Sequence, residues 1–356
     1  KLTLLGGGGF RVPLMFRTLL ADQSERRVTE LRLWDTDAGR LAVIRSILQA
    51  MAQGHPRAPE VRVAQNLEEA VAGTDFVFSA IRVGGTEGRA TEETIAHCCG
   101  VLGQETTGFG GLDYALRGIP TAVRIAETIA RLAPGAHLIN FTNPAGIITE
   151  VSSRILGDRV IGICDSPVGL ARRVLDTLEG AGLVATGTAS RVIAGDDRVR
   201  LDYAGLNHLG WLQRLLVDGD DVLPLLLERP DLIESFEEGR LFGAGWLRQL
   251  GSVPNEYLHY YYFARETRRA DEAVEATRGV FLATQQRDFY ARAATLPGPE
   301  AYALWEATRL RREETYMASN RLAAGGVERD AADLASGGYD RVALAVMKAI
   351  AFDETT

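Results

Sequence analysis

Short apolar runs alternate with segments of helical periodicity over the first half of the chain. Five runs have the length and side chains of strands: residues 2–5, 31–34, 75–81, 135–141 and 159–163. Between them, residues 38–51 and 121–132 repeat apolar side chains at helical spacing. Strands that alternate with helices favour an α/β fold, with a doubly wound parallel sheet covered on both faces.

The pattern changes after about residue 170. Residues 191–194 and 198–201, around Gly195-Asp196-Asp197, predict a β-hairpin. Helical patterns follow at residues 223–227, 270–290, 299–322 and 339–352. We therefore expect a first domain at residues 1–168, and a fused, mainly helical α+β domain at residues 169–356.

Composition narrows the class of protein. The chain has 356 residues, 46% of them hydrophobic, which is enough for a large core. The net charge of −8 and the absence of a basic stripe in the sequence argue against a nucleic-acid partner. No apolar run reaches the length of a membrane span, and no secretory signal pattern is visible. Three cysteines suit a reducing compartment, so we expect a cytoplasmic location with no membrane partner.

The first predicted strand ends in a glycine loop, Gly6 to Gly9, that leads into a helical segment. Glycines allow the backbone to approach a pyrophosphate, whose charge the N-terminus of a helix favours. Asp35 ends the second predicted strand, where a carboxylate can bind a ribose and thereby favours NAD over NADP. The fingerprint is imperfect because Arg11 stands where a third glycine or alanine is usual, and a glycine loop can also be a plain turn. We interpret the first domain as a Rossmann-like NAD-binding domain.

Two residues are candidate metal ligands. Cys164 ends the fifth predicted strand beside Asp165, and His208 lies in Leu206-Asn207-His208 about forty residues later. Taken singly, each also fits a buried structural residue. Together, a thiolate and an imidazole suit a borderline-soft divalent metal and leave coordination positions open for substrate oxygens.

Two further segments carry polar groups that fit a site. Asn143 follows the fourth predicted strand, at the edge of the sheet where ligands bind in such folds, although a cap before a Pro-initiated helix explains it equally well. Tyr257, Tyr260 and Tyr261 share one face of a predicted helix. Aromatic packing accounts for most such residues, but a phenol near a metal can act as a base.

In combination these residues resemble the family-four glycoside hydrolases, the NAD- and metal-dependent group that handles phosphorylated and other glycosides. The matching segments follow the family's order from residue 2 to about residue 280: the glycine loop, residues 81–85 with Arg89, and residues 103–111, 141–144, 162–167, 206–208 and 255–258. This group departs from the usual two-carboxylate mechanism of glycosidases. The resemblance implies that NAD⁺ takes a hydride from C3 of the sugar, a tyrosine removes the C2 proton, the aglycone is eliminated, water adds, and the hydride returns.

The resemblance also implies roles for individual residues. Cys164 and His208 would bind the metal, expected to be Mn²⁺, and Tyr257, with Tyr261 as the alternative, would be the base. The residues expected to bind NAD are Gly6, Gly7, Gly8, Gly9, Phe10, Asp35 and Arg82. The residues expected to contact the substrate are Arg89, Asn143 and Arg278, the last of them through a sugar phosphate.

Anomer preference depends on conflicting residues. Asp165 is similar to the acid that serves as general acid in family members acting on α-linked phosphoglucosides, whereas Val83-Gly84-Gly85 and the short chain are similar to the β branch. We predict a 6-phospho-β-glucosidase acting on a phosphorylated disaccharide or aryl glycoside, as a homodimer or homotetramer by resemblance. A 6-phospho-α-glucosidase or a hydrolase of unphosphorylated glycosides is the alternative within the family. An NAD-dependent polyol or hydroxyacid dehydrogenase and a non-catalytic nucleotide sensor are the alternatives outside it.

Overall fold

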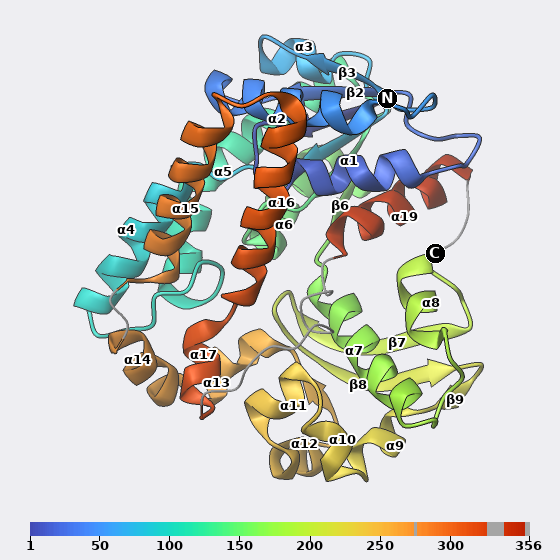
Figure 1. Cartoon of the computed structure of the whole chain (residues 1–356), viewed down its shortest axis with the longest axis vertical. Coiled ribbons are helices and arrows are strands. Elements are labelled where there is room, and N and C mark those ends of the chain that lie inside the picture. The colour runs from blue at the N-terminus through green and yellow to red at the C-terminus, as the bar shows by residue number, and fades with distance from the viewer. Residues whose placement is uncertain (274–275, 326–337, 353–356) are drawn as a thin grey trace. The chain divides into compact units, whose positions relative to one another are not determined.

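The computed structural model describes residues 1–273, 276–325 and 338–352 (Figure 1). The chain forms two compact units. Unit 1 contains Lys1–Ile163, Ala276–Arg312 and the residues from Val346 onward, and unit 2 contains Cys164–Glu275 and Glu313–Ala345. The chain therefore leaves unit 1 after its last strand and comes back to it twice. The domain boundary near residue 168 stays a prediction.

The centre of unit 1 is a parallel sheet of six strands. Its spatial order is β3 (Glu60–Val63), β2 (Glu30–Trp34), β1 (Leu2–Leu5), β4 (Phe76–Ser79), β5 (His137–Asn140) and β6 (Val160–Gly162). This order, 3-2-1-4-5-6, is that of dinucleotide-binding folds, so the predicted α/β fold with a Rossmann-like sheet is confirmed. All residues of β1 are buried, because the strand is central and covered on both faces.

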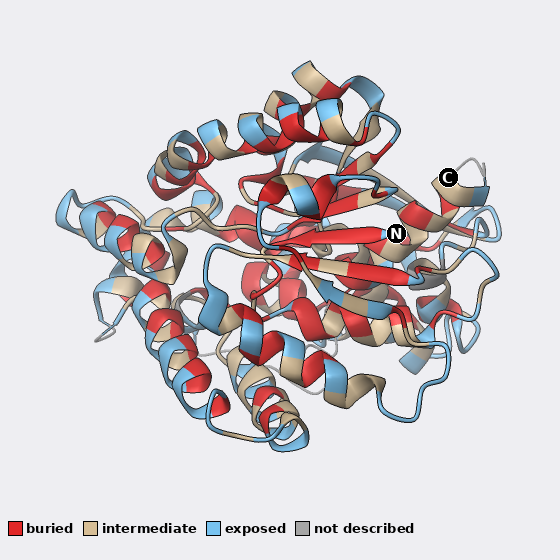
Figure 2. Cartoon of the chain, turned by 90° about the horizontal axis from the view of Figure 1, so that it is seen from above, coloured by how far each residue is buried: buried red, intermediate tan, exposed pale blue. Residues whose placement is uncertain are grey.

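Helices cover the sheet of unit 1. Those that follow its strands in the first 163 residues are α1 (Val12–Ala21), α2 (Ala38–Ala52), α3 (Leu67–Val71), α4 (Gly85–Cys98), α5 (Gly108–Leu132), α6 (Ala145–Leu156) and the short η1 (Gly157–Arg159). Figure 2 shows the buried strands between helices whose outer sides are exposed. Later segments add α15 (Arg278–Ala293), which runs beside α4, and α16 (Gly298–Glu314). Helix α19 (Tyr339–Phe352) matches its predicted bounds.

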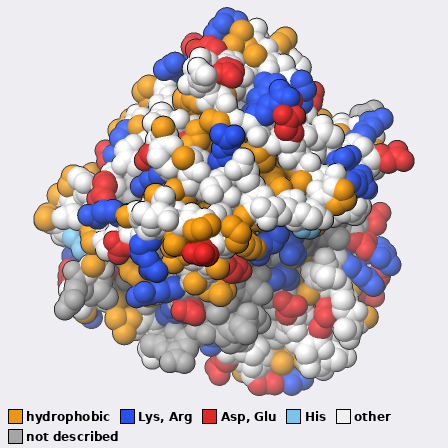
Figure 3. Space-filling model, turned by 45° about the horizontal axis from the view of Figure 1, so that its top comes forward, with side chains coloured by type: hydrophobic (Ala, Val, Ile, Leu, Met, Phe, Trp, Pro, Cys, Tyr) orange, Lys and Arg blue, Asp and Glu red, His pale blue; other side chains and the backbone are white. Residues whose placement is uncertain are grey.

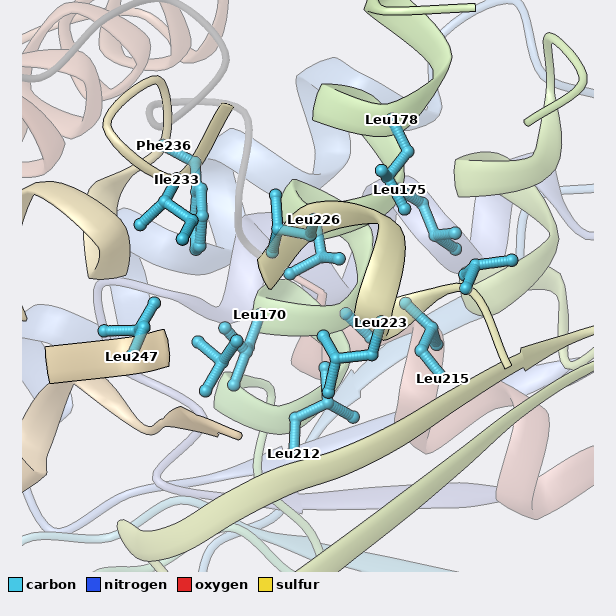
Figure 4. Packing of buried hydrophobic residues seen from close by; sticks show 14 of the residues in the cluster. Leu170, Leu175, Leu178, Leu212, Leu215, Leu223, Leu226, Ile233, Phe236 and Leu247 are labelled. Atoms are coloured by element: carbon cyan, nitrogen blue, oxygen red, sulfur yellow. The ribbon is translucent and has the colours of Figure 1, made fainter. Parts of the chain in front are cut away.

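Unit 2 combines short helices with a small antiparallel sheet. The sheet has the order β10 (Val253–Pro254), β8 (Leu209–Val217) and β7 (Val199–Leu206), and β9 (Asp220–Asp221) pairs with β8. The helices are α7 (Ser166–Gly180), α8 (Thr188–Ala194), α9 (Leu223–Leu227), α10 (Pro230–Ile233), α11 (Glu237–Phe242), α12 (Ala244–Leu250), η2 (Glu256–Leu258), α13 (His259–Tyr262), α14 (Ala264–Glu272) and α17 (Ala318–Ala323). Leucines of α7, β8 and α9 form its core, among them Leu170, Leu212 and Leu223 (Figure 4). The predicted second α+β region is therefore confirmed as a fold class.

The predicted hairpin of residues 191–201 is wrong. Residues 191–194 belong to helix α8, whose N-terminus is stabilised by the Glu179 carboxylate accepting hydrogen bonds from the N–H groups of Gly187 and Ala189. Ala189 and Val192, three residues apart, both pack on the core of unit 2, which favours the helix over a strand. The real hairpin joins β7 to β8, with Leu206 opposite Leu209 and Asn207 and His208 as its turn.

Two predicted helices are each divided in the structure. The helix expected at residues 270–290 is the end of α14 followed by α15, which starts after the N-cap residue Thr277; positions 274 and 275 lie outside the described residues. The helix expected at residues 299–322 is α16 followed by α17, with Met317 in a left-handed conformation between them. None of the helices in the described ranges combines the length and apolar character of a membrane-crossing segment. On the face in Figure 3, acidic and basic side chains are interspersed.

Candidate functional site

The glycine loop lies against strands β2 and β4. Gly6 has a φ of +84°, and a Cβ there would lie 2.6 Å from the carbonyl oxygen of Ala80. The N–H groups of Gly6 and Gly7 donate to the carbonyl oxygen of Trp34 at 3.0 and 2.8 Å. Only glycine fits both the left-handed conformation and this close approach. The tight turn after β1 is therefore fixed by local sterics, as a dinucleotide-binding loop requires.

Asp35 is in contact with this loop. Its Oδ2 accepts a hydrogen bond from the N–H of Gly8 at 2.9 Å, and its Oδ1 accepts one from the N–H of Asp37 at 3.0 Å. The carboxylate therefore lies beside the turn, at the end of β2, where an acid can bind ribose hydroxyls. The loop, the strand order and this carboxylate together fit an NAD site in unit 1.

Two aromatic residues that the sequence reasoning missed hold the loop from the other side. Tyr290 of α15 donates from its hydroxyl to the carbonyl oxygen of Gly8 at 2.6 Å. Trp305 of α16 donates from its indole N–H to the carbonyl oxygen of Phe10 at 2.7 Å. The ring of Phe10 is buried against Phe289, with centroids 5.1 Å apart. No local pattern signals these bonds, because their partners are about 280 to 295 residues apart.

Four arginines act on Glu105 in unit 1, and a fifth, Arg278, bonds to the backbone of one of them. We call this group the arginine cluster and define it as Arg11, Arg82, Arg89, Arg278 and Arg312. Arg82 and Arg89 both form ion pairs with Glu105, the latter at 2.8 Å between Nη1 and Oε2. Arg89 is buried and also donates from Nε to Glu93 at 2.7 Å. The predicted substrate residue Arg89 and the predicted NAD residue Arg82 therefore share one carboxylate.

The helix that carries Arg278 is anchored to the same cluster. Oε2 of Glu93 accepts from the N–H of Gly279 at 2.6 Å, at the start of α15. A Cβ on Gly279 would lie 2.8 Å from the backbone nitrogen of Ala90, so the glycine allows α15 to approach α4 closely. The Arg278 side chain donates to the carbonyl oxygen of Arg312 at 2.8 Å. The structure thus brings Arg278 and Arg89, which are 189 residues apart in sequence, into one network.

Electrostatics make the arginine cluster a site of positive potential. Burial alone would raise the pKa of Glu105, but the charges of Arg89, Arg82, Arg312 and Arg11 outweigh it and hold the pKa at about 2. Burial and the like charges of Arg11, Arg278 and Arg89 together lower the pKa of Arg312 to about 9, against the attraction of Glu105. Arg312 is thus a buried cation crowded by other cations, an environment that an anion stabilises. Sequence reasoning missed Glu105 and Arg312.

Unit 2 contains both candidate metal ligands. Cys164 is half-buried directly after β6. Burial and the negative charges of Asp165 and Glu256 together raise the pKa of its thiol to about 12, against the hydrogen bonding to Ser166. His208 is buried at the tip of the β7–β8 hairpin with a φ of +63°. A non-glycine residue in that conformation is strained, which is common at functional sites.

Tyr257 joins His208 in a network of ring contacts and hydroxyl bonds. The imidazole of His208 stacks on the Tyr257 ring with centroids 3.9 Å apart. The hydroxyl of Tyr316 donates to the hydroxyl of Tyr257 at 3.0 Å and lies 3.5 Å from Oε1 of Glu256. The same Oε1 accepts from the hydroxyl of Ser166 at 3.1 Å. Sequence reasoning missed Tyr316, which lies 59 residues from Tyr257 in the sequence.

The prediction that Tyr257, Tyr260 and Tyr261 share one face of a helix is only partly correct. Residues 256–258 form the 3-10 turn η2, and α13 begins at His259. The rings of Tyr257 and Tyr260 lie 6.2 Å apart. Tyr257 is 7% exposed, whereas Tyr261 is 50% exposed. The change from 3-10 to α geometry separates Tyr261 from the buried network, and the assignment of Tyr257 as the base stays a prediction.

The donor set and its surroundings fit a divalent cation. Cys164 supplies a soft sulfur donor and His208 a borderline nitrogen donor. Cys164 lies close enough to Glu256 to feel its charge, and His208 stacks on Tyr257, the residue after Glu256. Within the described part of the chain, Oε2 of Glu256 is buried without a hydrogen-bond partner. A cation would counter the negative charge that disfavours the Cys164 thiolate, because metal binding deprotonates a thiol. Among the described residues, no three His, Cys, Asp or Glu side chains converge on a common metal position.

The remaining predicted residues divide between the units. Asp165 is the half-buried residue before α7, so unit 2 contains it together with Cys164, His208 and Tyr257. Asn143 follows β5 in unit 1, next to Thr142, whose hydroxyl accepts from the N–H of Ile81 at 3.1 Å. The glycine loop, Asp35 and the arginine cluster lie in unit 1 with Asn143.

Comparison with known proteins identifies the family. The model of the family 4 glycosyl hydrolases matches residues 1–179, and the model of their C-terminal domain matches residues 203–356. The chain belongs to family 4 of the glycosyl hydrolases. The family resemblance inferred from the motifs is therefore confirmed.

The relatives that this chain matches include both 6-phospho-beta-glucosidases and 6-phospho-alpha-glucosidases. A probable 6-phospho-beta-glucosidase of Bacillus subtilis is 31% identical over 287 residues, which are 78% of this chain and 62% of the relative. A 6-phospho-alpha-glucosidase of Leptotrichia buccalis is 31% identical over 280 residues, 74% of this chain and 60% of the relative. The chain thus spans about three-fifths of the length of these curated relatives.

A solved structure of the same kind supports the fold assignment. The 6-phospho-beta glucosidase of Thermotoga maritima, solved with manganese, NAD⁺ and glucose-6-phosphate, has a TM-score of 0.70 and 25% identity. The similarity covers 88% of this chain and 72% of that one. This chain thus shares with the Thermotoga maritima protein the Rossmann-like sheet followed by a helical region with a small antiparallel sheet.

Proposed function

We propose that this family 4 protein is an NAD- and divalent-metal-dependent glycosidase that cleaves 6-phospho-β-glucosides. The observation that carries the proposal is the arginine cluster around Glu105. A sugar 6-phosphate carries two negative charges near neutral pH, and guanidinium groups bind phosphate oxygens in pairs. Four arginine charges act on one carboxylate, that of Glu105. An unphosphorylated glucoside has no anionic group that could use so much positive charge.

The relatives support the phosphorylated substrate. Both named relatives are phosphoglucosidases, and the Thermotoga maritima structure was solved with glucose-6-phosphate. Within the arginine cluster, Arg89 and Arg278 come from motifs matched in the sequence. We assign them to the phosphate, with Arg312 and Arg11 adding positive potential. Glu105 occupies the centre of the cluster and would have to share its arginines with the phosphate.

Each part of the proposed mechanism has residues of this chain assigned to it. The glycine loop and Asp35 bind NAD, and Cys164 and His208 hold the metal. NAD supplies reversible hydride acceptance at C3, and the metal supplies polarisation of the oxygens on C2 and C3. Tyr257 accepts the proton from C2, and Asp165 is assigned to protonate the leaving oxygen. Tyr257 is buried, which limits the access of water to the assigned base.

The β preference rests on Val83-Gly84-Gly85. One observation favours the α-anomer instead: Asp165 stands directly after Cys164, where α-specific members have their general acid. We therefore retain a 6-phospho-α-glucosidase as the second candidate.

Four substrates test the proposal: the nitrophenyl α- and β-glucosides, each with and without a 6-phosphate, assayed with NAD⁺ and Mn²⁺. We expect turnover of the β-6-phosphate above the other three.

Arg278→Gln tests the assignment of the phosphate. It should raise KM for the phosphorylated substrate by about tenfold, because one charge-assisted hydrogen bond is lost. The control Arg154→Gln changes an exposed arginine that pairs with Glu150 on α6, and should have no effect. Equal turnover of the unphosphorylated β-glucoside would contradict the proposal, and NADH accumulating in proportion to product would indicate a dehydrogenase.

A further inference from the structure

Ring contacts restrict movement of the Tyr257 ring perpendicular to its plane. They restrict movement within that plane less. His208 lies parallel to it, with planes 6° apart, and Tyr260 lies tilted at 41°. Stacked rings can shift parallel to one another, because offset arrangements are preferred over an exact face-to-face one. Asn255 fixes the backbone, since its Oδ1 accepts from the N–H of Tyr257 at 3.0 Å. The position of the hydroxyl within the ring plane needs a further contact.

The hydroxyl of Tyr316 makes that contact. It lies 3.0 Å from the hydroxyl of Tyr257 and 3.5 Å from Oε1 of Glu256. A phenol has one proton to donate, and the shorter distance favours the bond to Tyr257. Burial and the neighbouring Tyr257 and Glu256 raise the pKa of Tyr316 well above its usual range, so Tyr316 keeps its proton. It is therefore available as a donor near neutral pH.

Tyr316 is itself held in place by the turn between α16 and α17. The Arg321 guanidinium donates to the carbonyl oxygens of Tyr316 and Glu314, the latter at 2.9 Å. Arg321 is buried, and the N–H of Tyr316 donates to the carbonyl oxygen of Glu313 at 3.1 Å. A donor with a fixed backbone can place its partner to within a few tenths of an ångström, as supporting residues of catalytic groups must.

We propose that Tyr316 is a positioning residue that fixes the hydroxyl of Tyr257 for removal of the C2 proton. The inference rests on the proposed function, because it requires Tyr257 to be the base. Tyr316 acts through Tyr257 and does not itself exchange a proton with the sugar. A role in packing alone would need only the aromatic ring of Tyr316, and that difference makes the two roles separable.

Tyr316→Phe tests the proposal because it removes the hydroxyl and keeps the ring. We expect kcat for the 6-phospho-β-glucoside to fall by about 10²-fold, the effect of a catalytic group displaced by about 1 Å, with KM within about threefold of wild type. We also expect the isotope effect of C2-deuterated substrate on kcat to increase, since proton removal becomes slower than the other steps. Binding of NAD⁺ and Mn²⁺ should stay unchanged.

Tyr260→Phe is the matched control. Its hydroxyl bonds the sulfur of Met317 at 3.7 Å, and the change keeps its ring in place beside Tyr257. The control should keep kcat and the C2 isotope effect near wild type. If Tyr316→Phe does not fold, Arg321→Gln provides the test, because it loosens the backbone of Tyr316 and should lower kcat and raise the isotope effect in the same way.

The outcomes separate this inference from the proposed function. A wild-type protein that turns over no phosphoglucoside and exchanges no C2 hydrogen with solvent contradicts the proposed function, and the inference fails with it. A wild-type protein that does both, together with a Tyr316→Phe variant whose kcat and isotope effect stay within twofold of wild type, overturns the inference alone.

Discussion

The imidazole of His208 lies parallel to the ring of Tyr257, with centroids 3.9 Å apart and planes 6° apart. His208 reaches this position because it occupies the two-residue turn of the β7–β8 hairpin in a left-handed conformation. The hairpin is anchored in the core of unit 2 through Leu212 and Leu215. A predicted metal ligand and the predicted base are therefore held by one rigid element and one stacking contact.

Replacing His208 should weaken metal binding more than it weakens folding. Asn tolerates the left-handed conformation, so His208→Asn keeps the turn while removing the imidazole. We expect the Kd for Mn²⁺ to rise by at least about tenfold. Removing even a residue that only hydrogen-bonds to a metal ligand typically weakens metal binding by about that much. Titration of Mn²⁺ followed by electron paramagnetic resonance measures this directly. Tyr257→Phe is the control, since it keeps the stack and should bind Mn²⁺ like wild type. An unchanged Kd in His208→Asn would remove His208 from the metal site.

Removing the hydroxyl of Tyr290 should loosen the glycine loop. Tyr290→Phe leaves the buried carbonyl oxygen of Gly8 without its 2.6 Å donor. Such a group costs about 1–3 kcal/mol of unfolding free energy, and we expect the affinity for NAD⁺ to fall by about tenfold as the loop loses order. Urea unfolding and a fluorescence titration with NAD⁺ measure the two effects. Tyr302→Phe changes a part-exposed hydroxyl bonded to Arg17 and should leave NAD⁺ affinity unchanged. Equal affinities in all three proteins would refute the role of Tyr290.

Glu105 should contribute stability that depends on pH. Its pKa is about 2 in the folded protein and 4.5 as a free side chain, so the ionised form is favoured by folding. The contribution is fully present above about pH 4.5 and is lost as the pH falls toward 2, because the folded-state pKa is the lower one. A shift of this size corresponds to about 3 kcal/mol. Glu105→Gln should therefore be less stable than wild type at pH 7, and the gap in urea unfolding should narrow between pH 4.5 and 3. A gap independent of pH would contradict this account.

Breaking the buried ion pair of Arg173 and Glu238 should be costly. Both side chains are at most 6% exposed, and the two groups form paired hydrogen bonds, one of 2.9 Å from Nε. Arg173→Met leaves a buried carboxylate unpaired, which costs about 3–5 kcal/mol of unfolding free energy. The double variant Arg173→Met, Glu238→Leu should regain most of that loss, as measured by urea unfolding. A double variant as unstable as Arg173→Met would mean that the pair stabilises the fold beyond neutralising a buried charge.

Much of unit 1 could be predicted from the sequence because its central strands are buried on both faces. Apolar runs such as residues 2–5 and 137–140 therefore stand out. Strand β3 was missed because Glu60-Val61-Arg62-Val63 lies at the sheet edge and alternates apolar and charged residues over only four positions. Residues 191–194 have strand-like side chains, but the contacts of α8 with α7 and the Glu179 carboxylate decide for a helix.

In the candidate site too, some residues could be predicted from local sequence and others depend on contacts formed on folding. Cys164, His208 and Tyr257 belong to local motifs and could be identified by their neighbours in sequence. Tyr316 and Arg312 could not, because what makes them notable is the chemical group they face after folding. Neither has a residue pattern around it that distinguishes it from ordinary helix-end positions.

The bonds from Tyr290 and Trp305 to the glycine loop limit how this protein can be divided. A fragment that ends at residue 163 contains every strand of the parallel sheet and the whole loop, yet lacks both donors. The part of the chain with the predicted NAD site is thus not one continuous segment that can be excised or exchanged with another chain. A shortened chain that joins residues 276–312 to the first 163 would keep the loop and its two supports together.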